Sequence, residues 1–132
     1  MGNTARKFVE TVDGRTAPAQ LEAERPIDLV HLAKQTFGER DLEAELLRLF
    51  DRQAAQIVAR LSDPVMPDRR WRSDLAHTLK GSARAIGAFG VASAAESYEA
   101  CCAANDDLES ALSDLAETVS AAHLAIDALL AG

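Results

Sequence analysis

Aromatic residues and cysteine are scarce in this chain of 132 residues. Phe, Trp and Tyr together make up 5% of the sequence, and there are two cysteines. A core must therefore be built from Leu, Ala, Ile and Val, and because Leu and Ala favour helices, the composition favours an all-helical protein. Cys101 and Cys102 are adjacent and lack the two-residue gap of a redox or zinc motif, so we interpret them as reduced thiols.

Positive charge is also in short supply, with 14 Lys and Arg against 21 Asp and Glu and a formal net charge of −7. Nucleic acids and anionic membrane surfaces both require Lys and Arg, so neither is an expected partner. No apolar run approaches the roughly 20 residues of a membrane-spanning helix. Residues 1–6 contain no apolar segment of the kind that begins a signal peptide. We therefore expect a cytoplasmic protein.

Residues 1–25 carry few large apolar side chains and mix Gly14 and Pro18 with charged residues. Because such a segment buries little surface, we expect a flexible N-terminal arm over 1–25 and a single domain over 26–132. The domain is expected to begin with a short helix, since Pro26 and Asp28 are residues typical of a first turn. Gly38 is placed to end that helix.

Four longer helical patterns follow, over about residues 41–61, 68–86, 88–104 and 108–130. Asp41 is expected to cap the first of them, and Gly87 to end or bend the second. Amphipathic helices with short connectors predict an all-α fold, an antiparallel up-down-up-down four-helix bundle. The short helix after Pro26 is an extra N-terminal element at one end.

The helix over 68–86 has an apolar side and a polar side. At about 100° per residue, five residues share the sector expected to face the core: Trp71, Leu75, Leu79, Ser82 and Ile86. His77 projects from the opposite side, with Lys80, Gly81 and Arg84 around it. This combination indicates that an anionic group binds and leaves at the imidazole.

A neutral imidazole is a competent nucleophile near neutral pH and can hold a phosphoryl group. Lys80 and Arg84 lie on the same face as His77 and can offset the charge of that group. The other ring nitrogen needs a hydrogen-bond partner from another helix. Glu99 is the candidate, because the chain runs 87 − 77 = 10 residues out to Gly87 and 99 − 87 = 12 residues back.

Gly81 is the most informative residue near His77, because glycine in mid-helix costs about 1 kcal/mol relative to alanine. A bare helix surface one turn after a nucleophile would let another protein approach closely. We assign Arg70, Ser73 and Asp74, which precede His77 on the same helix, to the same partner-binding surface. The other histidines are interpreted as structural: His31 as partly exposed, and His123 at a core boundary. They lie too far apart in sequence to predict a metal site.

The segment His77-Thr78-Leu79-Lys80-Gly81-Ser82-Ala83, followed by Ile86-Gly87-Ala88, resembles the signature of bacterial histidine-containing phosphotransfer (HPt) domains. Glu99 stands where that family tends to carry the Gln or Glu that orients the imidazole. The resemblance implies a four-helix bundle that relays a phosphoryl group between aspartates of response-regulator receiver domains through the outer nitrogen of His77. It also implies a hybrid histidine kinase upstream, a monomer, and no metal or cofactor here, because the Mg²⁺ belongs to the receiver.

Three other functions compete with phosphotransfer as interpretations of this sequence. A sensor-kinase dimerisation domain usually carries an acid directly after its histidine, where this chain has Thr78, and a nearby proline. There is also no Gly-rich nucleotide-binding segment, so we expect a phosphocarrier without its own ATP-dependent kinase activity. The phosphoacceptor module of a chemotaxis-type kinase remains an alternative. A non-catalytic helical adaptor also remains, but it would leave the exposed His77 and Gly81 without an explanation.

Overall fold

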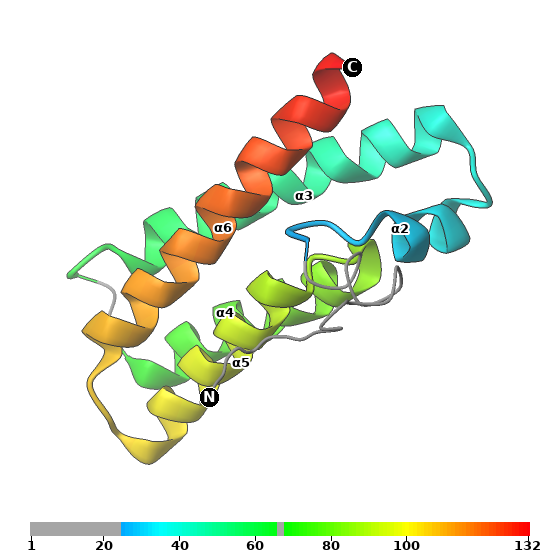
Figure 1. Ribbon diagram of the computed structural model, residues 1–132. Helices are drawn as coiled ribbons and strands as arrows, with labels where there is room; N and C mark the ends of the chain where they lie inside the picture. Colours follow the sequence, from blue (N-terminus) through cyan, green and yellow to red (C-terminus); the bar gives the residue numbers. More distant parts are fainter. Residues whose placement is uncertain (1–24, 66–67) are drawn as a thin grey trace, which may run out of the picture.

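The computed structural model describes residues 25–65 and 68–132, and helices make up most of both ranges (Figure 1). Their bounds are α2 Leu29–Thr36, α3 Arg40–Leu61, α4 Arg69–Ile86, α5 Phe89–Ala104 and α6 Leu108–Ala131. No strand occurs in either described range, and the all-α prediction is confirmed. The arm expected over 1–25 lies outside the described residues except for Arg25.

Helices α3 to α6 form the bundle, and successive helices run in opposite directions (Figure 1). Each of them packs against the next, and α6 returns to pack against α3. Helix α2 packs against α3 and α4 at one end. The expected antiparallel bundle with a short extra N-terminal helix is therefore confirmed.

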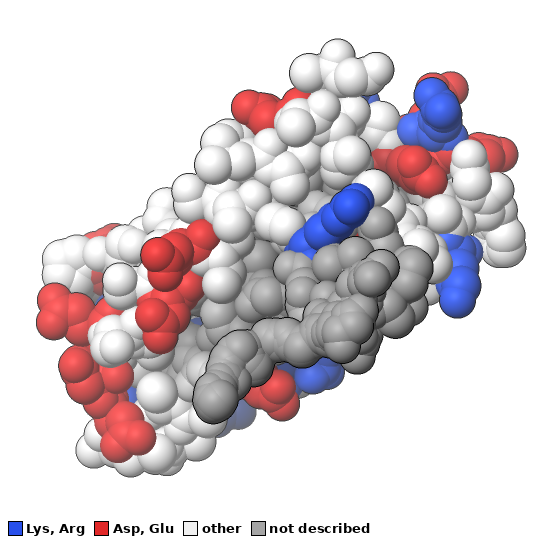
Figure 2. Space-filling view, viewed as in Figure 1, with Lys and Arg blue, Asp and Glu red and all other residues white. Residues whose placement is uncertain are grey.

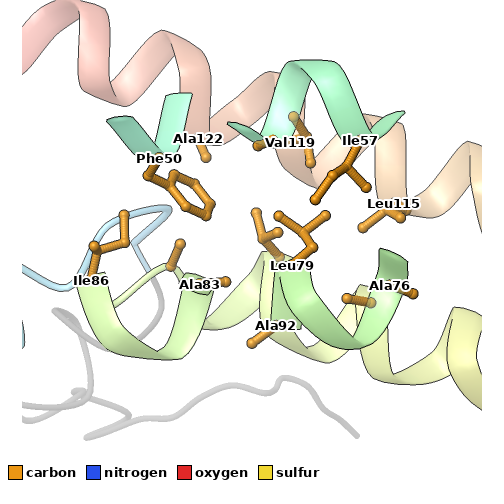
Figure 3. Close-up of a cluster of buried hydrophobic side chains, with 14 of the residues drawn as sticks. Phe50, Ile57, Ala76, Leu79, Ala83, Ile86, Ala92, Leu115, Val119 and Ala122 are labelled. Atoms are coloured by element: carbon orange, nitrogen blue, oxygen red, sulfur yellow. The ribbon is translucent and has the colours of Figure 1, made fainter. Parts of the chain in front are cut away.

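The core lies between the four long helices, where apolar side chains from each of them meet (Figure 3). Phe50 and Ile57 extend from α3 toward Leu79 of α4 and Leu115 of α6, and all four are buried. Helix α5 contributes mainly small buried residues, such as Ala92, together with Tyr98. Small side chains let α5 pack closely against α4, and this closeness brings polar groups on the two helices into contact.

Trp71 does not lie in the core as expected, because its side chain is 43% exposed. The buried face of α4 consists of Ala76, Leu79, Ala83 and Ile86. It is rotated away from Trp71, toward α5, the helix against which α4 packs most extensively. The Trp71 ring instead lies at the edge of α4, with the Arg60 guanidinium carbon 5.3 Å from its centroid, within the range of a cation–π contact.

The turn between α2 and α3 also differs from expectation. Helix α2 ends at Thr36, its C-cap Phe37 has a left-handed backbone at φ 55°, and Gly38 follows at φ 76°. Helix α3 begins at Arg40 after Glu39, so Asp41 lies in the first turn and does not cap it. In that position its negative charge still favours the helix N-terminus.

Gly87 ends α4 as expected, and it also joins two parts of the fold. Its φ is 87°, and its backbone N–H donates to the carbonyls of Ala83 and Arg84. Its own carbonyl accepts a 2.9 Å hydrogen bond from the backbone N–H of Asp28, the residue that caps α2. A Cβ at Gly87 would lie 2.9 Å from the Asp28 carbonyl oxygen, so only glycine fits this junction.

Two arginines at the start of α4 bind the ends of neighbouring helices. Arg72 donates to the carbonyl oxygen of Leu61 at 2.7 Å, at the end of α3. Arg69 donates to the carbonyl oxygen of Cys101 at 3.2 Å, near the end of α5. The last carbonyls of a helix have no partner within it, so Arg72 satisfies that of Leu61, whereas the Cys101 carbonyl also accepts from the backbone N–H of Asp106. Both bonds help to fix the position of α4 along the bundle.

Candidate functional site

The candidate site lies where α4 packs against α5, around the exposed side chain of His77. The His77 side chain is 67% exposed, and its Nδ1 lies 2.9 Å from Oε2 of Glu99 on α5. The Nζ of Lys80 lies 2.9 Å from the other Glu99 oxygen, Oε1. One carboxylate therefore binds both the imidazole of His77 and the ammonium group of Lys80, and each of its oxygens contacts one of them.

Among the charged side chains of this cluster, those of Lys80 and Glu99 are the most shielded, since they are 15% and 23% exposed. Burial by itself would raise the pKa of Glu99, but hydrogen bonds and charge from Lys80 and His77 outweigh burial and lower this pKa below its ordinary value. Glu99 is therefore ionised at neutral pH.

The ionised state of Glu99 decides which nitrogen of His77 carries the proton. A carboxylate without a proton only accepts hydrogen bonds, so the Nδ1 of His77 must be the N–H donor in the neutral ring. The lone pair then belongs to Nε2, the outer nitrogen of an exposed side chain. This tautomer, assigned from the hydrogen bond, leaves a nucleophilic nitrogen free to face a partner protein.

Helix α5 brings a second carboxylate to the site that the sequence analysis did not single out. Glu96 Oε1 lies 3.8 Å from Nη2 of Arg84, and both side chains are largely exposed. Lys80 and Arg84 each have an acidic neighbour on α5, so the site is close to charge-balanced. Of these two carboxylates, the sequence had indicated only Glu99. Glu96 stands three residues before Glu99, a spacing that places both on one face of α5, and this spacing was the available signal.

The residues assigned to partner binding line the same side of α4 as His77. Gly81 is exposed, and a Cβ added there would meet no atom of residues 25–65 and 68–132 within 4 Å. Arg70 and Asp74 are exposed and Ser73 is half-buried, and all three lie three, four or seven residues before His77. Packing among these described residues gives no reason for glycine at position 81.

His123 is a second exposed histidine bound to a carboxylate, but its charged neighbours differ from those of His77. It lies on α6, and its Nδ1 is 2.9 Å from Oδ1 of Asp51 on α3. A hydrogen bond and the charge of Asp51 raise the pKa of His123 above its ordinary value. Its other charged neighbour is again acidic, since Nε2 lies 4.0 Å from Asp127. His123 thus has two acidic neighbours, whereas Lys80 binds the same carboxylate as His77.

Figure 2 shows acidic side chains gathered at the end of the bundle where α5 turns into α6. Exposed residues of that turn and of the start of α6 include Asp106, Asp107, Glu109 and Asp114. Much of the excess negative charge on this face is therefore concentrated at one end of the molecule.

Within residues 25–65 and 68–132, no group of three or more His, Cys, Asp or Glu side chains is arranged to hold a metal ion. None of the described helices combines the length and the apolar character that crossing a bilayer requires.

Comparison with known proteins places this chain in a family. The family model described as the Hpt domain matches residues 41–132. Among solved structures, the chain is similar to histidine phosphotransferase ShpA from Caulobacter crescentus, with 31% sequence identity, a TM-score of 0.62, and coverage of 80% of this chain and 90% of that one. No curated protein matches. Since the Hpt model covers more than half of the sequence, the chain belongs to the Hpt-domain family.

Proposed function

We propose that this protein carries a phosphoryl group on His77 in a phosphorelay and passes it between aspartates of response-regulator receiver domains. The observation that carries the proposal is the 2.9 Å contact between His77 Nδ1 and Glu99 on the exposed side of α4. It leaves Nε2 as an outward-facing nucleophile in a chain of the Hpt-domain family.

In the forward step, the lone pair of His77 Nε2 attacks the phosphorus of a receiver aspartyl phosphate. The N–P bond forms as the P–O bond to the aspartate breaks, and the aspartate leaves as a carboxylate. The ring keeps its proton on Nδ1 and becomes positively charged. Glu99 accepts the hydrogen bond from that proton, so its negative charge offsets the charge of the ring. Transfer to the next receiver reverses each change.

Lys80 and Arg84 stabilise the phosphoryl group once it is on the ring. Lys80 is held against Glu99 beside the ring, so its ammonium group needs little reorganisation when the phosphoryl group arrives. Arg84 is farther along the same face and more exposed. Both cations offset the negative charge of the phosphoryl oxygens.

The docking surface for the receiver consists of the exposed side of α4 around Gly81, including Arg70, Ser73 and Asp74. With no side chain at Gly81, a receiver can bring its aspartate close to Nε2. The receiver supplies the Mg²⁺ for transfer, and a hybrid histidine kinase stands upstream. In this proposal the protein acts in the cytoplasm as a monomeric phosphocarrier without its own ATP-dependent kinase activity.

Transfer from a ³²P-labelled receiver tests the proposal, with Mg²⁺ present and a panel of receivers as donors. The wild-type protein is expected to take up acid-labile label, and His77→Gln none. His123→Gln is the matched control, because His123 is also exposed and bound to a carboxylate, and it should label like the wild type. Label that persists in His77→Gln would overturn the assignment, and absence of label on the wild type with every receiver would favour the adaptor interpretation.

A further inference from the structure

We propose that Glu96 is a positioning residue for phosphotransfer: it holds Arg84 while His77 is free and releases it to the phosphoryl group when His77 is loaded. This inference rests on the proposed function of His77 and concerns how the loaded state is stabilised. Its physical basis is a difference between the two ion pairs that join α4 to α5.

The two ion pairs differ in length and in exposure. Lys80 and Glu99 are 2.9 Å apart, and their side chains are 15% and 23% exposed. Arg84 and Glu96 are 3.8 Å apart, with side chains that are 55% and 60% exposed. A short, shielded pair stays formed, whereas a long pair in water is worth little and exchanges easily. Arg84 is therefore the cation of the site that can change partners.

Arg84 lies within reach of a group on the outer nitrogen of His77. It follows His77 by seven residues, or two turns, which is about 10.5 Å along the helix axis. Side chains on a helix lean toward its N-terminus, so the long arginine side chain leans back toward His77. Gly81 lies between the two on this face, and a Cβ there would meet nothing within 4 Å among the residues that the structure describes. No described side chain at position 81 therefore stands between Arg84 and a phosphoryl group on Nε2.

Once a phosphoryl group is on His77, it attracts Arg84 more strongly than Glu96 does. A phosphoryl group carries about 1.5 to 2 negative charges at neutral pH, against one on Glu96. A guanidinium also binds phosphoryl oxygens in bidentate fashion. Since Glu96 competes for the same guanidinium, it lowers the stability of phospho-His77 and keeps the phosphoryl group transferable to the next receiver.

The equilibrium of transfer between a receiver and this protein tests the proposal directly. The equilibrium constant is measured from the amounts of phospho-receiver and phospho-His77 at low protein concentration, where complexes are rare. Under these conditions a change that affects only docking alters the rates and leaves the equilibrium constant unchanged. Glu96→Gln is expected to shift the equilibrium toward phospho-His77 by about two- to fivefold, the size typical of an exposed ion pair.

The Arg84→Gln variant shows whether the effect of Glu96→Gln comes from the release of Arg84 or only from the loss of a negative charge. Alone, it should shift the equilibrium toward the phospho-receiver. In the Arg84→Gln background, Glu96→Gln should have no further effect, because no guanidinium remains to be released. Glu117→Gln, the same charge change at an exposed position on α6, is the matched control and should leave the equilibrium unchanged. An effect of Glu96→Gln that persists without Arg84 would overturn the proposal.

A spectroscopic measurement needs no receiver. Phosphorylation of the protein with phosphoramidate should shift the Nε–H signal of Arg84 in an NMR spectrum of ¹⁵N-arginine-labelled protein, and His77→Gln should abolish the shift. An unchanged Arg84 signal on phosphorylated wild-type protein would show that Arg84 does not change partners. If His77→Gln still takes up label, the proposed function fails. If His77 is phosphorylated but Glu96→Gln has no effect on the equilibrium, only the role of Glu96 fails.

Discussion

Glu99 on α5 accepts a 2.9 Å hydrogen bond from Nδ1 of His77 on α4, across 22 residues of sequence. Two features of the chain between them make this contact possible. Gly87 turns the backbone at φ 87° between the helices, and small buried residues such as Ala95 let α5 approach α4 closely. The turn and the packing of α4 against α5 thus determine the orientation of the imidazole.

Glu99→Gln should slow phosphotransfer without unfolding the bundle. Gln keeps the size of the side chain, and its amide oxygen can still accept a hydrogen bond from Nδ1, but without the negative charge it holds the Nδ1 proton less firmly and does not offset the charge of the phosphorylated ring. Hydrogen bonds to charged groups contribute about 1.5 to 3 kcal/mol against about 1 kcal/mol for neutral ones, and this difference corresponds to a rate loss of about tenfold. Single-turnover transfer from a labelled receiver measures this rate, and an unchanged rate would show that the charge of Glu99 has no part in transfer.

Lys80→Ala is expected to slow transfer because the cation nearest the imidazole is removed. The free energy of unfolding should change by only about 1 kcal/mol, since the ion pair with Glu99 lies at the edge of the helix interface. Lys34→Ala, at an exposed position on α2, removes the same charge elsewhere and serves as the control. Thermal unfolding followed by circular dichroism checks stability, and a large drop in Tm for Lys80→Ala would indicate a mainly structural lysine.

Gly81→Gln should weaken receiver docking while the helix becomes slightly more stable. An added Cβ meets no atom of the described residues within 4 Å, and replacing glycine in mid-helix gains about 0.5 to 1 kcal/mol. Transfer rates measured against receiver concentration should show a raised half-saturation concentration. Gly90→Gln on α5 is the matched control, because a Cβ there likewise meets nothing within 4 Å in the described part of the chain. Equal kinetics for both variants and the wild type would argue against close approach at Gly81.

The contact between His123 and Asp51 should make stability depend on pH. Because Asp51 raises the pKa of His123 in the folded state, the stabilisation is fully present below the ordinary pKa of 6.5. It is lost as pH rises through the higher folded pKa. Asp51→Asn should therefore destabilise the protein more at about pH 5 than at about pH 8. Urea unfolding of both proteins across this range measures the difference, and a difference that grows with rising pH would contradict the assignment.

Much of the fold could be predicted from local patterns. Helical spacing of apolar residues and the turn glycine Gly87 were sufficient to predict the antiparallel bundle. Counting residues on either side of Gly87 placed Glu99 level with His77, where the structure has it. This worked because two antiparallel helices joined by a short turn advance by the same rise per residue.

Other features depended on how the helices are rotated within the bundle. Periodicity predicted which residues of α4 are apolar and share a side. The side that is buried in the bundle includes Ala76 and Ala83, and Trp71 is left exposed. The charge balance of the site depended on the rotation of α5, which places Glu96 beside Arg84. Asp41 had the preference of a capping residue, yet the N-cap of α3 is Glu39, two residues earlier, after a turn with left-handed backbone at Phe37 and Gly38.

The most direct test of the account is the NMR spectrum of ¹⁵N-histidine-labelled protein, recorded before and after phosphorylation with phosphoramidate. Before phosphorylation, the neutral His77 ring should show its proton on Nδ1, and Glu99→Gln should weaken that preference. After phosphorylation, the phosphorus should be coupled to Nε2 of His77. A His77 ring with its proton on Nε2, or a phosphoryl group bonded to Nδ1 or to His123, would contradict the account.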